Sequence, residues 1–223
     1  DINVSGGVTP YSYAWSNGST EEDLVSLSGG AYLLVVSDLN NCIDSISVSL
    51  TEPLPLIAMI DSISNYNGYG VSCDLSSNGS VSASASGGVA PYSYLWSNGA
   101  TTDDISGLIA NSYVLNIEDL NGCLTTADTT LIAPAAFNAS YTFVNPGCNG
   151  SSNGSIDFSL TGGVAPYSFA WSNAATTEDL TAIPIGTYDL IYSDLNGCSG
   201  SISVTLTEPI VLSNNIAQQD VLC

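Results

Sequence analysis

The sequence predicts an all-β protein built from β-sandwich domains in tandem. One twelve-residue motif occurs three times, as GGVTPYSYAWSN from Gly6, GGVAPYSYLWSN from Gly87 and GGVAPYSFAWSN from Gly162. Apolar and polar residues alternate with a period of two through most of the chain, and no helical period persists beyond one turn. Gly, Pro and Asn separate the alternating runs, which is typical of the short strands and tight turns of a sandwich.

The repeated motif sets the frame of the domains. Trp15, Trp96 and Trp171 are 81 and 75 residues apart. A period of this size is close to one small domain and larger than a solenoid unit. The prolines that follow with the same steps are interpreted as domain ends. They divide the chain into repeat 1 at 1–53, which lacks its first strand, repeat 2 at 54–134, repeat 3 at 135–209, and the first strand of repeat 4 at 210–223. We expect the chain to be a fragment of a longer filamentous protein.

The first three strands of a repeat are clearest in repeat 3. A first strand is expected at 137–144 and a second at 154–161, where Ile156, Phe158 and Leu160 alternate with polar residues. A Gly-Gly pair ends the second strand, and a third is expected at 166–172. The third strand carries Trp171, the large residue expected in a sandwich core.

Three further strands complete the repeat. A short fourth strand is expected at about 178–183, a fifth at 187–194 and a sixth at 200–207. Tyr188, at the start of the fifth strand, resembles a tyrosine corner, with Tyr32 and Tyr113 in the matching places. The aromatic stripe on the third strand can line a sugar site or fill the core. The core is favoured, because each strand of a sandwich has one inward face.

The composition excludes several classes of function. The chain has no Lys, Arg or His against 21 Asp plus Glu, for a net charge of −21. Phosphate neutralisation cannot therefore drive nucleic-acid binding, and the chain cannot dock electrostatically on an anionic membrane. Most acid–base and nucleophilic arrangements lack a base, so we expect no enzyme. No apolar run is long enough to span a membrane, so we expect no membrane insertion of this segment.

Regular cysteines predict disulfides and an oxidising compartment. Buried free thiols are the alternative, since Cys packs as a small hydrophobe. Cys73 to Cys123 and Cys148 to Cys198 both span 50 residues. The six extra residues of repeat 2 therefore lie before Cys73, in the stretch 65–70.

The strand directions decide the expected pairing. The first strand carries Cys73 and Cys148 to one end of their sandwiches, and the fifth strand carries Cys42, Cys123 and Cys198 to the opposite end. The two ends are about 20–25 Å apart, whereas bridged Cα atoms lie within about 7 Å. A bond inside one repeat is therefore excluded, and Cys73–Cys198 is predicted across the junction of repeats 2 and 3. The remaining cysteines are expected to pair outside the fragment or have no assigned partner: Cys42, Cys123, Cys148 and Cys223.

Acidic clusters recur at two places in each repeat. Asp-Leu-Asn closes the fifth strand, beginning at Asp38, Asp119 and Asp194, and a pair of acids precedes the fourth strand. Such oxygen ligands can hold Ca²⁺, but Asp and Asn also cap turns through their own backbone. Turns are favoured, so no cofactor is expected and Ca²⁺ stays the alternative. Paired carboxylates also serve glycosidases, but these lie in loops with no cleft implied.

The combination of motifs resembles the SprB repeat. It consists of GGxxPYSYxWSNG, a Gly-x-Tyr strand, Asp-Leu-Asn-Gly-Cys, and a Ser/Thr-rich strand ending in Glu-Pro. That repeat builds large surface adhesins of gliding Bacteroidota and related secreted proteins. The resemblance implies an immunoglobulin-like module, with the repeats arranged end to end, exported to the extracellular cell surface for adhesion or gliding motility. Repeat 2 departs from the pattern in its insertion and in Ala133, where repeats 1 and 3 have Glu.

The resemblance also implies O-glycosylation, which is common on exported Bacteroidota proteins at Asp-Ser/Thr followed by an apolar residue or Thr. The candidate acceptors are Ser45, Ser62 and Thr129. Thr129 is expected to point inward and is the weakest of the three.

Two functions remain open. The favoured one is a structural stalk that extends a binding tip from the cell, with neighbouring repeats of the same chain as its partners. The alternative is a module that binds surface glycans, proteins or other cells. Its best candidate contact is the insertion, with Tyr66 and Tyr69. These two tyrosines can instead fold onto the domain's own surface, and their exposure distinguishes the two cases.

Overall fold

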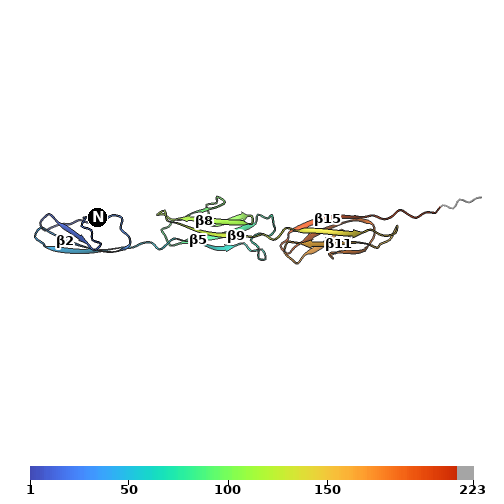
Figure 1. Cartoon of the computed structure of the whole chain (residues 1–223), viewed down its shortest axis with the longest axis horizontal. Coiled ribbons are helices and arrows are strands. Elements are labelled where there is room, and N and C mark those ends of the chain that lie inside the picture. The colour runs from blue at the N-terminus through green and yellow to red at the C-terminus, as the bar shows by residue number, and fades with distance from the viewer. Residues whose placement is uncertain (215–223) are drawn as a thin grey trace, which may run out of the picture. The chain divides into compact units, whose positions relative to one another are not determined.

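The computed structural model describes residues 1–214, which form strands and connecting loops without a helix (Figure 1). The chain divides into two compact units. The first comprises Asp1–Ile57 with two loops of repeat 2, Ser86–Pro91 and Asp119–Cys123. The second comprises the other described residues and therefore holds most of repeat 2 and all of repeat 3. The proposed repeat boundaries stay a prediction, because this division does not follow them.

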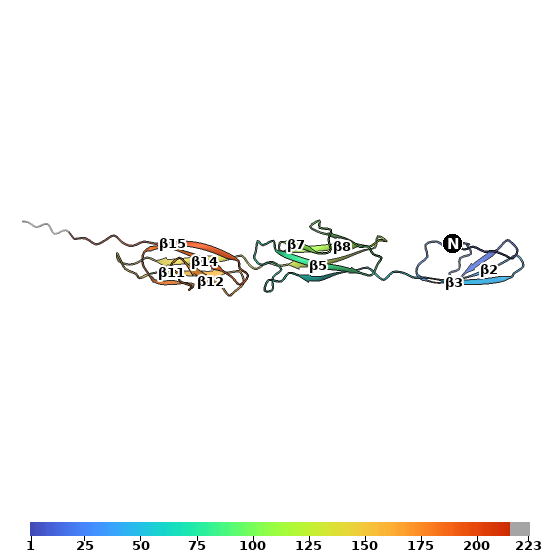
Figure 2. The same ribbon diagram turned by 180° about the vertical axis from the view of Figure 1, so that it is seen from behind.

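Repeat 3 is a sandwich of two antiparallel three-stranded sheets, whose strands β11, β12, β14 and β15 are labelled in Figure 2. One sheet has the order β10 (Asn138–Val144), β11 (Gly154–Thr161) and β13 (Leu180–Ile183). The other has the order β12 (Ser168–Trp171), β14 (Gly186–Ser193) and β15 (Ser199–Leu206). The first, second and fourth strands thus face the third, fifth and sixth, as in an immunoglobulin-like sandwich.

Repeat 2 has the same two sheets. One contains β4 (Ile57–Ile63), β5 (Gly79–Ser86) and β7 (Ile105–Leu108), and the other contains β6 (Ser93–Trp96), β8 (Asn111–Glu118) and β9 (Leu124–Leu131). The strand order predicted from the alternation is therefore confirmed in both repeats.

Repeat 1 has one sheet, formed by β1 (Ser12–Trp15), β2 (Gly30–Ser37) and β3 (Ile43–Leu50). The inward side of β3 is open, so Val48 is 43% exposed whereas Val204, at the same position of repeat 3, is 2% exposed. A cleft of about 520 Å³ lies over this face, bordered by the segment 1–7. The sheet β10-β11-β13 covers the corresponding face in repeat 3.

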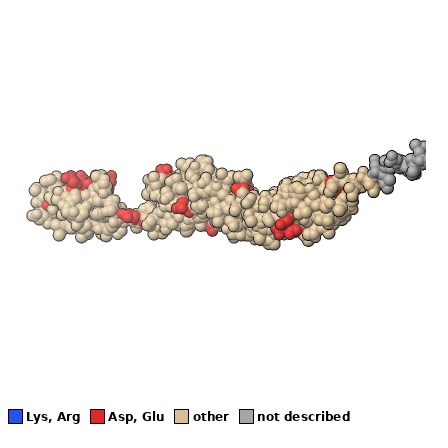
Figure 3. All heavy atoms as spheres, turned by 45° about the vertical axis from the view of Figure 1, so that its right-hand side comes forward, with Lys and Arg blue, Asp and Glu red and all other residues tan. Residues whose placement is uncertain are grey.

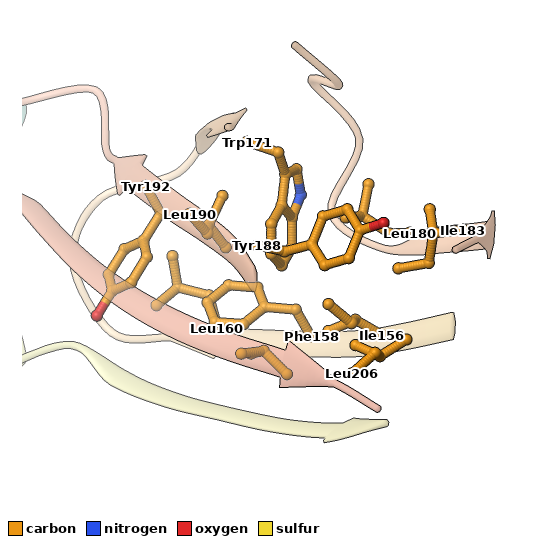
Figure 4. Close-up of a cluster of buried hydrophobic side chains, with 11 residues drawn as sticks. Ile156, Phe158, Leu160, Trp171, Leu180, Ile183, Tyr188, Leu190, Tyr192 and Leu206 are labelled. Carbon is orange, nitrogen blue, oxygen red and sulfur yellow. The ribbon is translucent and has the colours of Figure 1, made fainter. Parts of the chain in front are cut away.

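The core of repeat 3 is the apolar side of both sheets (Figure 4). Trp171 is 4% exposed, and its indole N–H donates to the Thr177 carbonyl at 2.9 Å. Phe158 packs edge-on against Phe169 at 6.0 Å between ring centroids. The aromatic stripe is therefore core, and its indole N–H is satisfied inside the domain.

The tyrosine corners are confirmed in all three repeats. The hydroxyls of Tyr32, Tyr113 and Tyr188 each donate to the carbonyl four residues earlier, at 2.9 Å. Each bond ties the start of the fifth strand to the loop before it, which fixes where that strand enters the sandwich.

A Gly-Gly pair ends the second strand because the backbone there is left-handed and crowded. Gly162 and Gly163 have φ of +85° and +60°. A Cβ on Gly163 would lie 2.4 Å from the Phe137 ring and 2.7 Å from Asp194 Oδ2. Only glycine combines this conformation with this approach to neighbouring atoms.

Candidate functional site

The insertion of repeat 2 is a miniature hairpin in the β4–β5 loop. Tyr66 and Tyr69 exchange backbone hydrogen bonds, with N–O distances of 2.7 and 3.3 Å. Between them Asn67 and Gly68 have φ of +53° and +97°, the backbone that an Asn-Gly hairpin turn requires. The Tyr66 hydroxyl donates to the Asn78 carbonyl at 3.0 Å. The hairpin is therefore held by its own domain.

The cysteine turn that follows has the same bonds in repeats 2 and 3. The N–H of Ser76 donates to the Cys73 carbonyl at 3.1 Å, and Ser151 donates to Cys148 at the same distance. An Asn at the end of each loop accepts from the residue before the cysteine: Asn78 from Ser72 at 3.1 Å and Asn153 from Gly147 at 3.0 Å. Both loops thus present their cysteine from the same local structure.

The Asp-Leu-Asn turns are built around the Asp carboxylate. In repeat 3, Asp194 Oδ1 accepts from the N–H groups of Asn196 and Cys198, both at 2.9 Å, and Oδ2 accepts from Val164 at 2.8 Å. Asp194 is 8% exposed. The carboxylate joins the β14–β15 turn to the Gly-Gly loop, so its first role is structural.

The same bonds lower the pKa of two of these carboxyls. Hydrogen bonds from the N–H groups of Cys42 and Val8 lower the pKa of Asp38. Burial alone would raise the pKa of Asp119, but bonds from Cys123, Val89 and Asn121 outweigh it and lower the pKa overall. Asp119 in turn raises the pKa of the neighbouring Cys123 thiol.

The favoured interpretation of the acidic turns agrees with these contacts. Within residues 1–214, no three Cys, Asp or Glu side chains lie together in a way that could hold a metal ion. In the acid pair before β13, Asp179 accepts from the Phe158 N–H at 2.9 Å. Calcium binding stays a hypothesis that these contacts do not require.

The cysteine loop of repeat 2 meets the β14–β15 turn of repeat 3. A disulfide joins Cys73 to Cys198, with 5.8 Å between the Cα atoms and 125 residues between them in sequence. The bond predicted from the strand directions is therefore present, and the bonds inside one repeat, Cys73–Cys123 and Cys148–Cys198, are absent from the described structure.

Asn196 makes a second set of contacts at this junction. Its amide nitrogen donates to the carbonyls of Tyr66 at 3.2 Å and Ser72 at 3.1 Å. Its amide oxygen accepts from the Asn67 side chain at 2.6 Å. The Cys198 sulfur lies 3.2 Å from the Ser72 carbonyl oxygen, a contact without a proton, because a disulfide sulfur carries none. These contacts hold the β14–β15 turn against the hairpin.

The predicted binding tyrosines lie in this junction. Tyr66 and Tyr69 are both half-buried, and Tyr66 uses its hydroxyl and its carbonyl in bonds to the protein itself. The sequence placed Asn67 in the insertion and Asn196 in an Asp-Leu-Asn turn, but it predicted no contact between them. The only signal for Asn196 is its recurrence beside a cysteine in each turn, which turn chemistry already explains.

The other predicted residues lie apart from this junction. Cys42, Cys123 and Cys148 are exposed thiols, so the alternative of buried thiols is wrong for them. Cys223 lies outside the described residues.

Ser45 and Ser62 are exposed and Thr129 is half-buried, which fits the order expected for the three glycosylation candidates. Their glycosylation stays a prediction.

The comparisons with known proteins point to one family. A family model described as the SprB repeat matches residues 1–20, 71–101 and 140–176. The second and third segments carry the cysteine loop, the second strand and the repeated tryptophan motif, and the first segment carries the tryptophan motif. No curated protein matches the chain.

Solved structures with immunoglobulin domains are similar at low scores. The first eight Ig domains of Down Syndrome Cell Adhesion Molecule match at 11% identity and TM-score 0.43, over 89% of this chain and 33% of that one. The first four Ig domains of Dscam1 isoform 9.44 match at 10% identity and TM-score 0.33, over 89% and 64%. The amphioxus IgVJ-C2 molecule matches at 14% identity and TM-score 0.27, over 54% and 90%. The chain thus spans about a third of the first of these structures and under two thirds of the second.

Proposed function

Because this chain is a SprB-repeat protein, a repeat protein of the cell-surface adhesion type, we propose that it is a stalk segment of a large secreted or cell-surface adhesin filament. The stalk extends a binding tip from the cell, for adhesion or gliding motility. The observation that carries this proposal is the disulfide between repeats 2 and 3. A bond inside one domain would stabilise that domain alone, whereas this bond fastens one repeat to the next.

The bond changes the path of a pulling force. Tension entering repeat 2 along β4 reaches Cys73, crosses to Cys198 and leaves repeat 3 along β15. Residues 74–197, which include most of the core of both repeats, lie inside the covalent loop and carry none of that load through their backbone. A stalk needs domains that stay folded under tension, and a freely diffusing binding module does not.

The exposed cysteines extend the argument to other junctions. Cys148 sits in a turn with the same bonds as the turn of Cys73, and Cys42 sits in the same Asp-Leu-Asn turn as Cys198. Each is suited to form the same bond with a neighbouring repeat. Successive covalent loops would then overlap along a longer array, because Cys148 lies inside the loop closed by Cys73 and Cys198.

The composition supports a role outside catalysis and nucleic-acid binding. Figure 3 shows acidic groups at separate places on the visible face, and the sequence supplies no cation to neutralise them. Within the described residues, no helix is long and apolar enough to cross a membrane. We assign no catalytic step to the chain and place it at the cell surface or outside the cell, where disulfides persist.

Electron microscopy of the isolated protein tests the stalk. Each repeat should advance a rod by about 23–33 Å or slightly more, the length of a strand of seven to ten residues. A particle in which repeats 2 and 3 lie side by side would contradict the proposal.

The alternative, a binding module, keeps one candidate surface in the hairpin. A glycan or protein ligand would have to use the part of Tyr69 and Asn67 that the junction leaves exposed. Glycan arrays with the Tyr66→Ala, Tyr69→Ala double variant as control would reveal such binding, which the stalk proposal does not require.

A further inference from the structure

The hairpin contacts Asn196 of repeat 3 through hydrogen bonds that are separate from the disulfide. Asn196 is half-buried at the junction, whereas Asn40 and Asn121, at the same position of the other two turns, are exposed. The three asparagines share their local turn, since each donates its N–H to the preceding Asp at 2.8–2.9 Å. The difference therefore comes from the loop that Asn196 meets.

We propose that the β4–β5 loop of repeat 2 is a receptor surface for an Asp-Leu-Asn-x-Cys turn, with Asn196 as the residue that it recognises. The loop offers the Tyr66 and Ser72 carbonyls to one end of the amide and the Asn67 side chain to the other. An amide satisfies both, because it donates and accepts on the same group. Asp, Ser or Ala at position 196 would leave at least one of these partners unpaired.

Two of the three partners belong to the insertion. Tyr66 and Asn67 lie within residues 65–70, and repeat 3 has no counterpart of this stretch. The Cys148 turn of repeat 3 is held instead by Glu208, whose two oxygens accept from the Asn149 side chain and the Gly150 N–H, both at 2.6 Å. Repeat 2 has Ala133 in place of Glu208, and its loop is tied to the end of β9 by the Gly70 N–H, which donates to the Ile132 carbonyl at 2.9 Å.

The two cysteine loops are therefore different receptors built on one turn. The loop of repeat 2 recognises the amide of its neighbour, while the loop of repeat 3 presents a carboxylate-braced turn without the hairpin. A turn that docks at Cys73 gains contacts that it cannot gain at Cys148. The correct pairing of a turn with the Cys73 loop is thereby favoured before the disulfide forms.

A redox titration of the full chain tests this recognition. Replacing Cys42, Cys123, Cys148 and Cys223 by Ser leaves Cys73 and Cys198 as the only pair. The effective concentration of the Cys73 and Cys198 thiols is then measured in glutathione buffers. Free thiols are alkylated, and the oxidised fraction is read by mass spectrometry. Loss of two or three hydrogen bonds in Asn196→Ala should lower it about tenfold, as should deletion of residues 65–70. The matched control Asn40→Ala, in the same turn of repeat 1, should leave it unchanged.

Combining the changes separates recognition from a defect in the turn. On the background that lacks residues 65–70, Asn196→Ala should have a clearly smaller effect, because its main partners are already gone. Asn67→Gly keeps the left-handed backbone, removes only the side-chain donor, and should have an intermediate effect. The proposal is wrong if Asn196→Ala costs as much on the deletion background as on the full chain, or no more than Asn40→Ala.

A measurement without the disulfide guards against an indirect effect. In the Cys73→Ser, Cys198→Ser chain, hydrogen exchange at residues 66–72 should stay slower with Asn196 than with Ala in its place. Equal exchange rates would show that the loop does not recognise the amide on its own and would also overturn the proposal.

Discussion

The polar side chains that recur in every repeat mostly bond to backbone groups of their own domain. The Trp indole, the Tyr hydroxyl of the corner and the Asp carboxylate each satisfy a turn or loop, as Trp171, Tyr188 and Asp194 show. Residues that look chemically active in the sequence are thereby committed to structure. This predicts that their substitution changes the stability of the domain.

Asp119→Asn should destabilise repeat 2 in a pH-dependent way. The folded-state pKa of Asp119 is lowered, so the carboxylate adds stability above its unfolded pKa, and this stability is lost as the pH falls through the folded pKa. The difference in urea midpoint between the original chain and the variant should be present at pH 7 and shrink below about pH 4. The exposed Asp128→Asn on β9 is the control. A difference that is the same at pH 7 and pH 3 would argue against this role.

Gly163→Ala should destabilise repeat 3 by about 2–4 kcal/mol, because it combines left-handed strain with crowding at Phe137 and Asp194. Gly197→Ala is the matched control. Its φ of +80° is also left-handed, but a Cβ there meets nothing within 4 Å, so about 1 kcal/mol is expected. Thermal unfolding of both variants measures the difference. Equal losses would mean that the Gly-Gly loop yields to the added methyl group.

At the scale of elements, the strands repeat and the loops differ. The sheets of repeats 2 and 3 have the same order, whereas the loops that carry Cys73 and Cys148 share only the cysteine turn. The β4–β5 loop attaches repeat 2 to repeat 3, and we expect the β10–β11 loop to attach repeat 3 to a further repeat. The β-sandwich serves as a common support for these different loops.

Cys148 and Cys42 should cross-link separate molecules in preference to other pairings. On a background with Cys123→Ser and Cys223→Ser, one variant adds Cys42→Ser and the other adds Cys148→Ser. Mixed in equal amounts in a glutathione buffer, they should form the mixed dimer well above the half expected from random pairing. The reason is that the two retained turns match the two sides of the Cys73–Cys198 junction. Non-reducing gels show the result, and a random 1:2:1 distribution of dimers would count against it.

For the whole molecule, the two dominant features are the covalent loop and the missing cations. The disulfide joins two cysteines that are 125 residues apart in sequence. The 21 acidic residues have no Lys, Arg or His to pair with. Both features favour a chain that resists extension and collapse. The loop limits how far the chain can be drawn out, and carboxylate repulsion opposes a compact state.

Force spectroscopy should detect the covalent loop directly. Pulled from its ends with the Cys73–Cys198 bond intact, the chain should unfold to a contour length shorter by roughly 410–450 Å than after reduction, because 125 residues are withheld. The Cys73→Ser, Cys198→Ser chain should give the longer value with or without reductant. An unchanged length on reduction would show that the bond does not form in the protein.

Glycosylation should be visible in the intact mass of protein from its native host. Ser45 and Ser62 are exposed and should carry sugar, and the half-buried Thr129 should carry the least. The Ser45→Ala, Ser62→Ala double variant should lose most of the added mass. A mass equal to that of the bare sequence would end this prediction.

The sequence by itself determined the strands, their order and the end of the sandwich at which each cysteine within residues 1–214 lies. Period-two alternation separates the inward face, with residues such as Phe158 and Leu190, from the outward face, and short turns reverse each strand. Those local rules also exclude a bond inside one repeat. The tertiary structure decided that the Cys73 loop meets the turn of Asn196, and that the tyrosine hairpin serves this junction. Asn40, Asn121 and Asn196 are equivalent in their own turns. Only groups supplied by residues more than a hundred positions away, the Tyr66 and Ser72 carbonyls and the Asn67 side chain, give Asn196 a different role, and a local pattern cannot encode such contacts.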